Sequence, residues 1–200
     1  MKITSIKQQV KRAGRYSLFV EGKYAFSLSE TALLDSKLAS GQELTKEQID
    51  DYKKLSSDDK LYNRTLQWVA MRPRSKWEIE FYLQRKDAPP PLIETILNKL
   101  SIVGLVDDAK LAQALVNDRR LLRPTSRRKM IADLRKKHLS QEVIDQAIGH
   151  DNEAEQDALS AVVARKRKQT KYQDDEKLMQ YLARQGFGYD DIKTALKKDY

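Results

Sequence analysis

The sequence contains no cysteine, and this absence excludes several kinds of chemistry. Without thiols the chain cannot form disulfides, thiolate zinc sites or cysteine nucleophiles. No apolar run approaches the roughly 18–20 residues of a membrane-spanning helix, and Met1–Val10 lacks the apolar core of a signal peptide. We therefore expect a soluble protein of the cytoplasm that has no membrane partner.

Catalytic motifs are also missing: there is no Gly-rich phosphate loop, no HExxH and no GxSxG. His138 and His150 stand without a clustered carboxylate pattern, so we expect no metal site and no cofactor. Five acidic pairs could suggest magnesium chemistry, and a metal-dependent nuclease is the alternative that they leave open: Asp50-Asp51, Asp58-Asp59, Asp107-Asp108, Asp174-Asp175 and Asp190-Asp191. Several of them fall at expected linkers or helix starts, where carboxylates cap helices. The sequence therefore predicts a protein that is not an enzyme.

Apolar residues are scarce for a compact globule. They make up 40% of the chain, and charged residues make up 34%, against averages of roughly 45–50% and about 25%. Disorder would produce such a composition, but the apolar residues here are strongly periodic, which a disordered chain does not show. We therefore expect an elongated molecule, which has more surface per residue.

The amino-terminal part predicts a small β-rich head. Every second residue of Tyr16–Val20 and of Tyr24–Leu28 is a large apolar or aromatic residue, and the short turn Glu21-Gly22 joins the two segments, which is a hairpin pattern. Because a lone hairpin is marginally stable in water, Ile3–Val10 is expected to supply a third strand. Two helices should follow, one over Ser29–Leu38 and one that opens with the capping-box spacing of Thr45 to Gln48. Ser56–Asp59 then has the composition of a linker.

From Leu61 onward the sequence repeats. Four apolar positions recur after a shift of 51 residues and again after a further shift of 48 residues. The four columns are Ile79, Met130 and Leu178; Leu83, Leu134 and Leu182; Ile93, Ile144 and Ile192; and Leu97, Ile148 and Leu196. Ser75, Ser126 and Asp174 align in front of them, and all three are favoured helix N-cap residues.

Each unit therefore predicts a helix, a turn, a second helix after the N-cap residue, another turn and a third helix. We predict a mainly α fold: an elongated tandem repeat of three three-helix units behind a three-stranded head with short helices. The expected domains are residues 1–58 for the head, 61–106 for repeat 1, 107–152 for repeat 2 and 153–200 for repeat 3.

Positive charge indicates the kind of partner. The formal net charge is +9 and the sequence pI is about 9.5, which favours a polyanion such as nucleic acid. The candidate contact residues are cations in the turn before repeat 1's second helix, in the densest basic stretch and in a second basic run: Arg72, Arg74, Arg119, Arg120, Arg123, Arg127, Arg128, Lys129, Arg165, Lys166, Arg167 and Lys168. The alternative is that these cations only solvate the surface. Trp68 and Trp77 are expected to pack the repeat rather than to stack on bases.

Arg127, Arg128 and Lys129 are expected in the first turn after Ser126, where cations oppose the helix dipole by roughly 0.3–1 kcal/mol each when exposed. The matching turns of the other two repeats carry acidic residues. A helix N-terminus surrounded by cations is suited to a phosphate or an acidic side chain.

Several segments resemble the RecX family. The segment Ala70–Ser75 followed by Glu78, Leu83 and the acidic pair at residue 107 is similar to the family's opening repeat. The segment Leu182–Phe187 resembles its closing L-x-x-[RK]-G-F signature, with Gln185 before the glycine. The head, with its Arg15–Val20 segment, is similar to the extra amino-terminal region of longer members. The resemblance therefore covers nearly the whole chain.

The resemblance implies a regulator that binds the RecA recombinase filament on DNA. Such a regulator would inhibit ATP hydrolysis and strand exchange, and so act on DNA repair, recombination and the SOS response. It implies no catalytic residues. The expected partners are the RecA filament and single- or double-stranded DNA, and we expect a monomer. The alternative function is a helical-repeat nucleic-acid-binding protein that acts directly on DNA.

Overall fold

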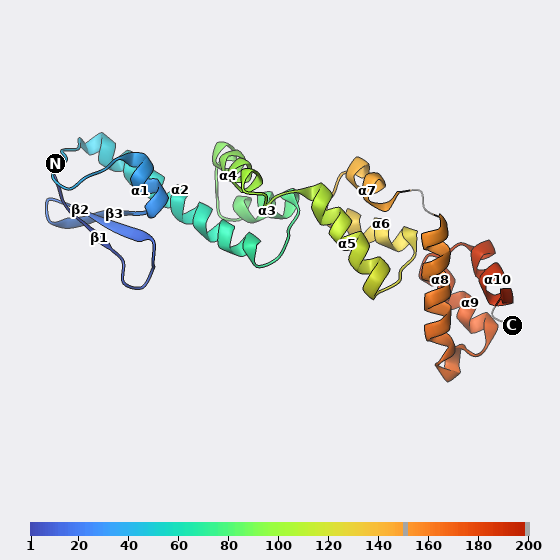
Figure 1. Ribbon diagram of the computed structural model, residues 1–200. Coiled ribbons are helices and arrows are strands. Elements are labelled where there is room, and N and C mark those ends of the chain that lie inside the picture. Colours follow the sequence, from blue (N-terminus) through green and yellow to red (C-terminus); the bar gives the residue numbers. More distant parts are fainter. Residues whose placement is uncertain (150–151, 199–200) are drawn as a thin grey trace. The chain divides into compact units, whose positions relative to one another are not determined.

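The computed structural model describes residues 1–149 and 152–198, and these fall into two compact units (Figure 1). Unit 1 contains Met1–Arg72 and Ala88–Ile96, and unit 2 contains Pro73–Asp87 and Leu97–Tyr200. Repeat 1 contributes residues to both units.

Unit 1 is built on a three-stranded antiparallel sheet in the order β1 (Ile3–Gln8), β2 (Arg15–Val20) and β3 (Lys23–Ser29). The strand pairs Leu18↔Phe26 and Tyr16↔Leu28 match the alternation of the predicted hairpin. Helix α1 (Glu30–Ser36) begins at the Ser29 cap. The apolar face of the sheet packs with residues of α2 (Lys46–Ala70) into one core. The predicted third strand, the short helix after Ser29 and the helix start at Thr45 are confirmed, but α2 has 25 residues and is not a short helix.

The predicted linker over Ser56–Asp59 is wrong, because α2 runs through it without a break. Ser56 is 2% exposed and donates its hydroxyl to the Ser27 carbonyl at 2.6 Å. Asp59 lies one turn further along the same face of α2. Two of these four polar residues, Ser56 and Asp59, therefore face the sheet and form hydrogen bonds there, as buried polar groups do, whereas Ser57 is exposed.

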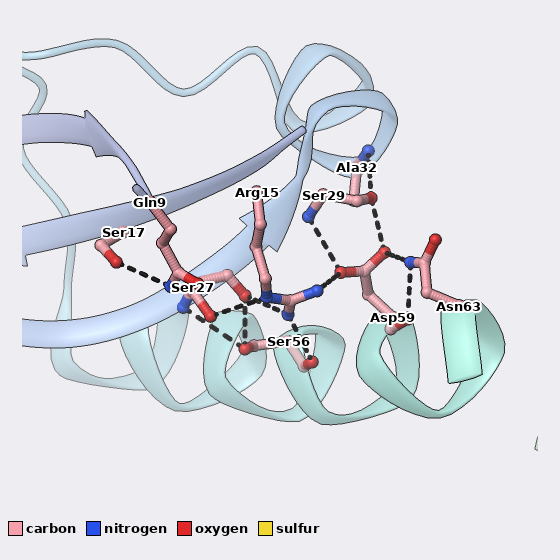
Figure 2. Close-up of polar contacts among 9 residues, drawn as sticks. All are labelled: Gln9, Arg15, Ser17, Ser27, Ser29, Ala32, Ser56, Asp59 and Asn63. Carbon is pink, nitrogen blue, oxygen red and sulfur yellow. Dashed lines mark hydrogen bonds and ion pairs between the residues drawn. The ribbon is translucent and has the colours of Figure 1, made fainter. Parts of the chain in front are cut away.

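Asp59 is the centre of that polar network (Figure 2). Its carboxylate accepts from the Arg15 guanidinium at 2.9 Å, and the two side chains are only 9% and 7% exposed. It also accepts from the Ser29 amide at 2.9 Å, the Ser29 hydroxyl at 2.6 Å and the Asn63 amide group at 2.8 Å. Four donors on one carboxylate offset the cost of burying its charge, and they connect all of β2, β3 and α2.

The rest of the described chain is helical. Its elements, in chain order, are α3 (Lys76–Gln84), α4 (Pro90–Ile102), α5 (Asp108–Leu122), α6 (Arg127–Arg135), α7 (Gln141–Ile148), α8 (Asn152–Arg167), the 3₁₀ turn η1 (Thr170–Tyr172), α9 (Asp175–Arg184) and α10 (Tyr189–Lys198). All three predicted N-caps are confirmed: the side chains of Ser75, Ser126 and Asp174 accept from the amides of the residues three positions later. Ser75 forms a full capping box with Glu78.

The four repeated columns are buried in every repeat. Their twelve side chains are at most 8% exposed, and Ile79, Ile144, Leu178, Leu182 and Ile192 are fully buried. Repeat 2 and repeat 3 each have a core of their own, formed by the columns together with the apolar face of α5 or α8. The mainly α fold of three three-helix units behind a three-stranded head is therefore confirmed, and the elongated shape stays a prediction.

Candidate partner-binding face of unit 2

Helix α6 has an N-terminus that an internal carboxylate already occupies. The Arg127 amide donates to Glu155 Oε2 at 2.7 Å, and Glu155 comes from the first turn of α8 in the next repeat. The same contact occurs one repeat earlier, where the Lys76 amide at the start of α3 donates to Asp108 Oδ1 at 2.8 Å. The acidic side chain expected at this N-terminus is thus the chain's own.

Both carboxylates are half-buried, and this changes their protonation equilibrium. Burial raises the pKa of the Glu155 carboxyl above its ordinary value, and Asp191 adds to the rise, while the Arg127 amide lowers it. Burial likewise raises the pKa of the Asp108 carboxyl, against the lowering effect of the Lys76 amide. Desolvation outweighs the hydrogen bonds in both cases, because it disfavours the charged form.

A second pair of contacts also repeats between consecutive repeats. Glu78 Oε1 lies 3.0 Å from Lys137 Nζ, with the side chains 19% and 27% exposed. At the equivalent positions one repeat later, Lys129 Nζ donates to Gln185 Oε1 at 2.7 Å. The position is the same but the chemistry differs, since an ion pair is replaced by a hydrogen bond between a cation and a neutral amide.

A third contact occupies the neighbouring positions. The Trp77 indole stacks on the His138 imidazole with ring centroids 3.6 Å apart, and on Phe81 at 5.2 Å. Trp77 therefore packs, as predicted, although it is 38% exposed. One repeat later, Arg128 and Gly186 stand in place of Trp77 and His138. A Cβ on Gly186 would lie 3.3 Å from Arg128 Cβ, so the two residues are in close contact.

We name these contacts joint 1 and joint 2. Joint 1 contains Lys76, Trp77, Glu78, Asp108, Lys137 and His138, and joint 2 contains Ser126, Arg127, Arg128, Lys129, Glu155, Gln185 and Gly186. In joint 2 the buried Ser126 hydroxyl also donates to the Gln185 carbonyl at 2.5 Å. Because the same positions meet twice, each joint fixes how one repeat of unit 2 follows the previous one.

Three of the predicted contact arginines in repeat 2, Arg119, Arg120 and Arg127, bind structural partners within the repeat. Arg119 forms an ion pair with Asp133 at 2.8 Å, with side chains 37% and 30% exposed. Arg120 donates to the Ile148 carbonyl at 3.0 Å. Arg127 donates its guanidinium to the Gly149 carbonyl. These side chains hold α5, α6 and the end of α7 together.

Other predicted cations of repeat 2 are exposed: Arg123, Arg128 and Lys129. Arg128 lines a hollow of about 710 Å³ along α6, together with Arg127, Ile131, Ala132, Arg135, Lys136 and His138. Asp133, the anion of this helix, points instead to Arg119. The lining of the hollow is therefore cationic around a small apolar floor, with no carboxylate among the residues that line it in the described part of the chain.

The remaining candidates are divided between exposed and packed positions. Arg72 is exposed and Arg74 is half-buried in the turn before α3. In the second basic run, Arg165 and Lys168 are exposed, whereas the Lys166 ammonium lies 4.7 Å from the centre of the Tyr181 ring. Arg167 donates to the Gln173 carbonyl at 3.0 Å and to the Asp175 carboxylate.

The sequence did not predict the joints or the Arg15–Asp59 network. Within residues 1–149 and 152–198, no group of three or more His, Asp or Glu side chains is arranged to hold a metal ion. No helix in that part of the chain is long and apolar enough to cross a bilayer. His150 lies outside the described residues.

Comparisons with known proteins agree with the architecture. Four family models match in order: the RecX N-terminal domain over residues 1–45, and the first, second and third RecX three-helix domains over residues 62–100, 107–148 and 153–196. "Regulatory protein RecX" from Listeria welshimeri is 30% identical over 200 residues, which cover 98% of this chain and 74% of the relative. "Regulatory protein RecX" from Bacillus subtilis is 28% identical, with 97% and 75% covered.

Two solved structures are similar as well. A crystal structure of regulatory protein RecX superposes with a TM-score of 0.77 at 28% identity, and the match covers 100% of this chain and 99% of that chain. RecX from Lactobacillus salivarius shares the fold, with a TM-score of 0.61 at 23% identity over 70% of this chain and 95% of that chain. With four matching family models and a relative that is 30% identical over 98% of this chain, this chain belongs to the RecX family of regulatory proteins.

Proposed function

We propose that this chain binds the RecA recombinase filament on DNA and regulates it, mostly by inhibiting ATP hydrolysis and strand exchange, so that it controls DNA repair, recombination and the SOS response in the cytoplasm. The observation that carries this proposal is the ordered match of all four RecX segments. The protein acts as a monomer that binds its partner and catalyses nothing.

The exposed cations at α6 support this function, and we propose that they form the contact surface. A RecA filament on DNA presents phosphates and acidic side chains, and arginine and lysine bind both through charge-assisted hydrogen bonds. Arg128 and Lys136 are exposed and line the hollow. Four other predicted contact residues have structural partners, so we rank them below the exposed cations as proposed contacts: Arg119, Arg120, Arg127 and Arg167.

A second function, direct action on DNA without a recombinase, is favoured by the same cations. Two titrations at one salt concentration separate the two functions: inhibition of RecA ATPase on single-stranded DNA, and binding of this chain to the same DNA alone. We expect half-maximal inhibition well below the concentration that half-saturates naked DNA. Inhibition that only follows occupancy of the DNA would support the direct function instead, and an unchanged ATPase rate would contradict the proposed regulation.

A further inference from the structure

The hollow along α6 combines a cationic lining with a stack of aromatic rings at one end. His138 lines the hollow and is exposed, and its ring is stacked on Trp77, which in turn is stacked on Phe81. The interplanar angles are 14° and 5°, so the three rings are nearly parallel. A stack that ends in an exposed ring can be continued by another flat group.

The cations of the hollow are positioned for a chain of phosphates. Arg128 lies in the first turn of α6 and Lys136 is its C-cap residue, eight positions later, and Arg135 adds a third exposed cation. Arg135 donates to Gln141 Oε1 at 2.8 Å at an exposed position, where a phosphate can compete for it. Because the α-helix rises 1.5 Å per residue, Arg128 and Lys136 begin about 12 Å apart along the axis. That spacing suits two phosphates of an extended strand better than one isolated anion.

We propose that this hollow binds single-stranded nucleic acid, with the phosphates held by Arg128, Arg135 and Lys136 and a base stacked on His138. Proteins that bind single strands combine a cationic groove with aromatic rings on which the bases stack. An acidic peptide would use the cations but not the ring, and a duplex has no unstacked base to offer. The site lies wholly within unit 2 and needs no recombinase, so it can fail while the proposed regulation holds.

The joints make this site specific to repeat 2. In joint 2, Arg128 and Gly186 stand in the places of Trp77 and His138, so no ring stack follows α9. Repeat 1 has Trp77, Gln84 and Arg85 at the positions of Arg128, Arg135 and Lys136, and it has Asp87 at the position of His138. Ring and cations therefore come together at α6 alone among the second helices of the three repeats, all of which lie in the described part of the chain.

The test measures binding of the full-length chain to a fluorescent oligodeoxythymidylate by anisotropy over a range of salt concentrations. Replacing both Arg128→Gln and Lys136→Gln should weaken binding more than tenfold at low salt and should lower the slope of log affinity against log salt by about 1.4, which is about 0.7 for each lost phosphate contact on a single strand. The control, Lys60→Gln with Arg64→Gln, removes the same charges from exposed positions on α2 and should leave the slope within about 0.3 of wild type.

A further variant tests whether a base stacks on His138. We use His138→Asn, because asparagine tolerates the left-handed backbone at this position (φ 54°). We expect at least about fivefold weaker binding of the oligonucleotide at an unchanged salt slope, since a stacked base contributes without a phosphate contact. Circular dichroism confirms that the variant is folded, and His138→Tyr should restore binding.

Three results would overturn the proposal. The first is equal loss of binding in the α2 control. The second is a duplex or a polyglutamate peptide of matched charge binding as tightly as the oligonucleotide. The third is a folded His138→Asn variant with unchanged affinity. If the oligonucleotide does not bind but RecA ATPase is still inhibited, this site is wrong and the proposed function stands.

Discussion

Joint 1 and joint 2 connect consecutive repeats through the same positions but with different side chains. Joint 1 uses an ion pair, Glu78 with Lys137, and a ring stack, Trp77 with His138. Joint 2 uses a cation and an amide, Lys129 with Gln185, and packs Arg128 against a glycine. The repeats therefore preserve the backbone geometry of the joint rather than a particular side-chain chemistry. Only the amide-to-carboxylate contact, to Asp108 or Glu155, has the same chemistry in both.

The backbone is the most sensitive part of joint 2. Gly186 has φ +93°, and an added Cβ would lie 2.9 Å from the Ser126 hydroxyl oxygen. We expect Gly186→Ala to lower the free energy of unfolding by about 2–4 kcal/mol, from strain and overlap together. Urea denaturation followed by circular dichroism measures the change.

The matched control is Gly104→Ala, where φ is +74° and no atom lies within 4 Å of the added Cβ. Strain alone should then cost about 1–2 kcal/mol. Equal losses in the two variants would show that the close contact in joint 2 does not contribute.

The second largest expected loss of stability distinguishes the two serine N-caps, Ser126 and Ser75. The Ser126 side chain accepts a hydrogen bond from the Lys129 amide, and its hydroxyl also donates to the Gln185 carbonyl. Ser126 is fully buried. Ser126→Ala should cost about 2–3 kcal/mol, because it removes a cap and leaves a buried carbonyl without its donor. Ser75→Ala should cost about 1 kcal/mol, the ordinary value for a lost cap. Differential scanning calorimetry of both variants ranks them, and the reverse order would be incompatible with the hydroxyl's role in joint 2.

The twelve column positions and the three N-caps could be predicted from the sequence, because burial and capping each leave a local pattern. The joints could not. Glu78 and Lys137 are 59 residues apart, and the equivalent pair is Lys129 with Gln185, so neither charge nor residue type repeats. The linker prediction over Ser56–Asp59 was wrong for a related reason. Polar residues indicate a linker unless they have a buried partner, and the partner of Asp59 is Arg15, which lies 44 residues away in the sequence.

Two variants exchange side chains between equivalent positions of joint 1 and joint 2 and measure how much each ion pair or cation–amide contact contributes to stability. Lys137→Gln gives joint 1 the glutamine of joint 2 and removes its ion pair, which should cost about 0.5–1 kcal/mol at low salt and less at high salt. Gln185→Lys places a second cation beside Lys129, so it should cost a similar amount that salt also reduces. Thermal unfolding at two salt concentrations checks both, and a loss that does not depend on salt would mean that the pair acts through packing.

The smallest expected effect is the pH dependence of the carboxylate contacts. Because the pKa of Glu155 is raised in the fold, its contribution to stability is fully present below the unfolded pKa, about 4.3, and is lost as the pH rises through the folded value. Glu155→Gln keeps an acceptor for the Arg127 amide and cannot ionise. Its stability relative to wild type should therefore increase between pH 4 and pH 7. A relative stability that falls over this range would mean that the ionised carboxylate is favoured.

We propose that the exposed face of α6, held in place by a joint at each of its ends, meets a RecA filament on DNA. Co-sedimentation tests it directly: filaments are assembled on single-stranded DNA with a nucleotide that is not hydrolysed, and the full-length chain is added at physiological salt. We predict that wild type and the variant with Lys60→Gln and Arg64→Gln pellet with the filament, while the variant with Arg128→Gln and Lys136→Gln binds at least tenfold more weakly. Wild-type protein that stays in the supernatant at every concentration would contradict the account.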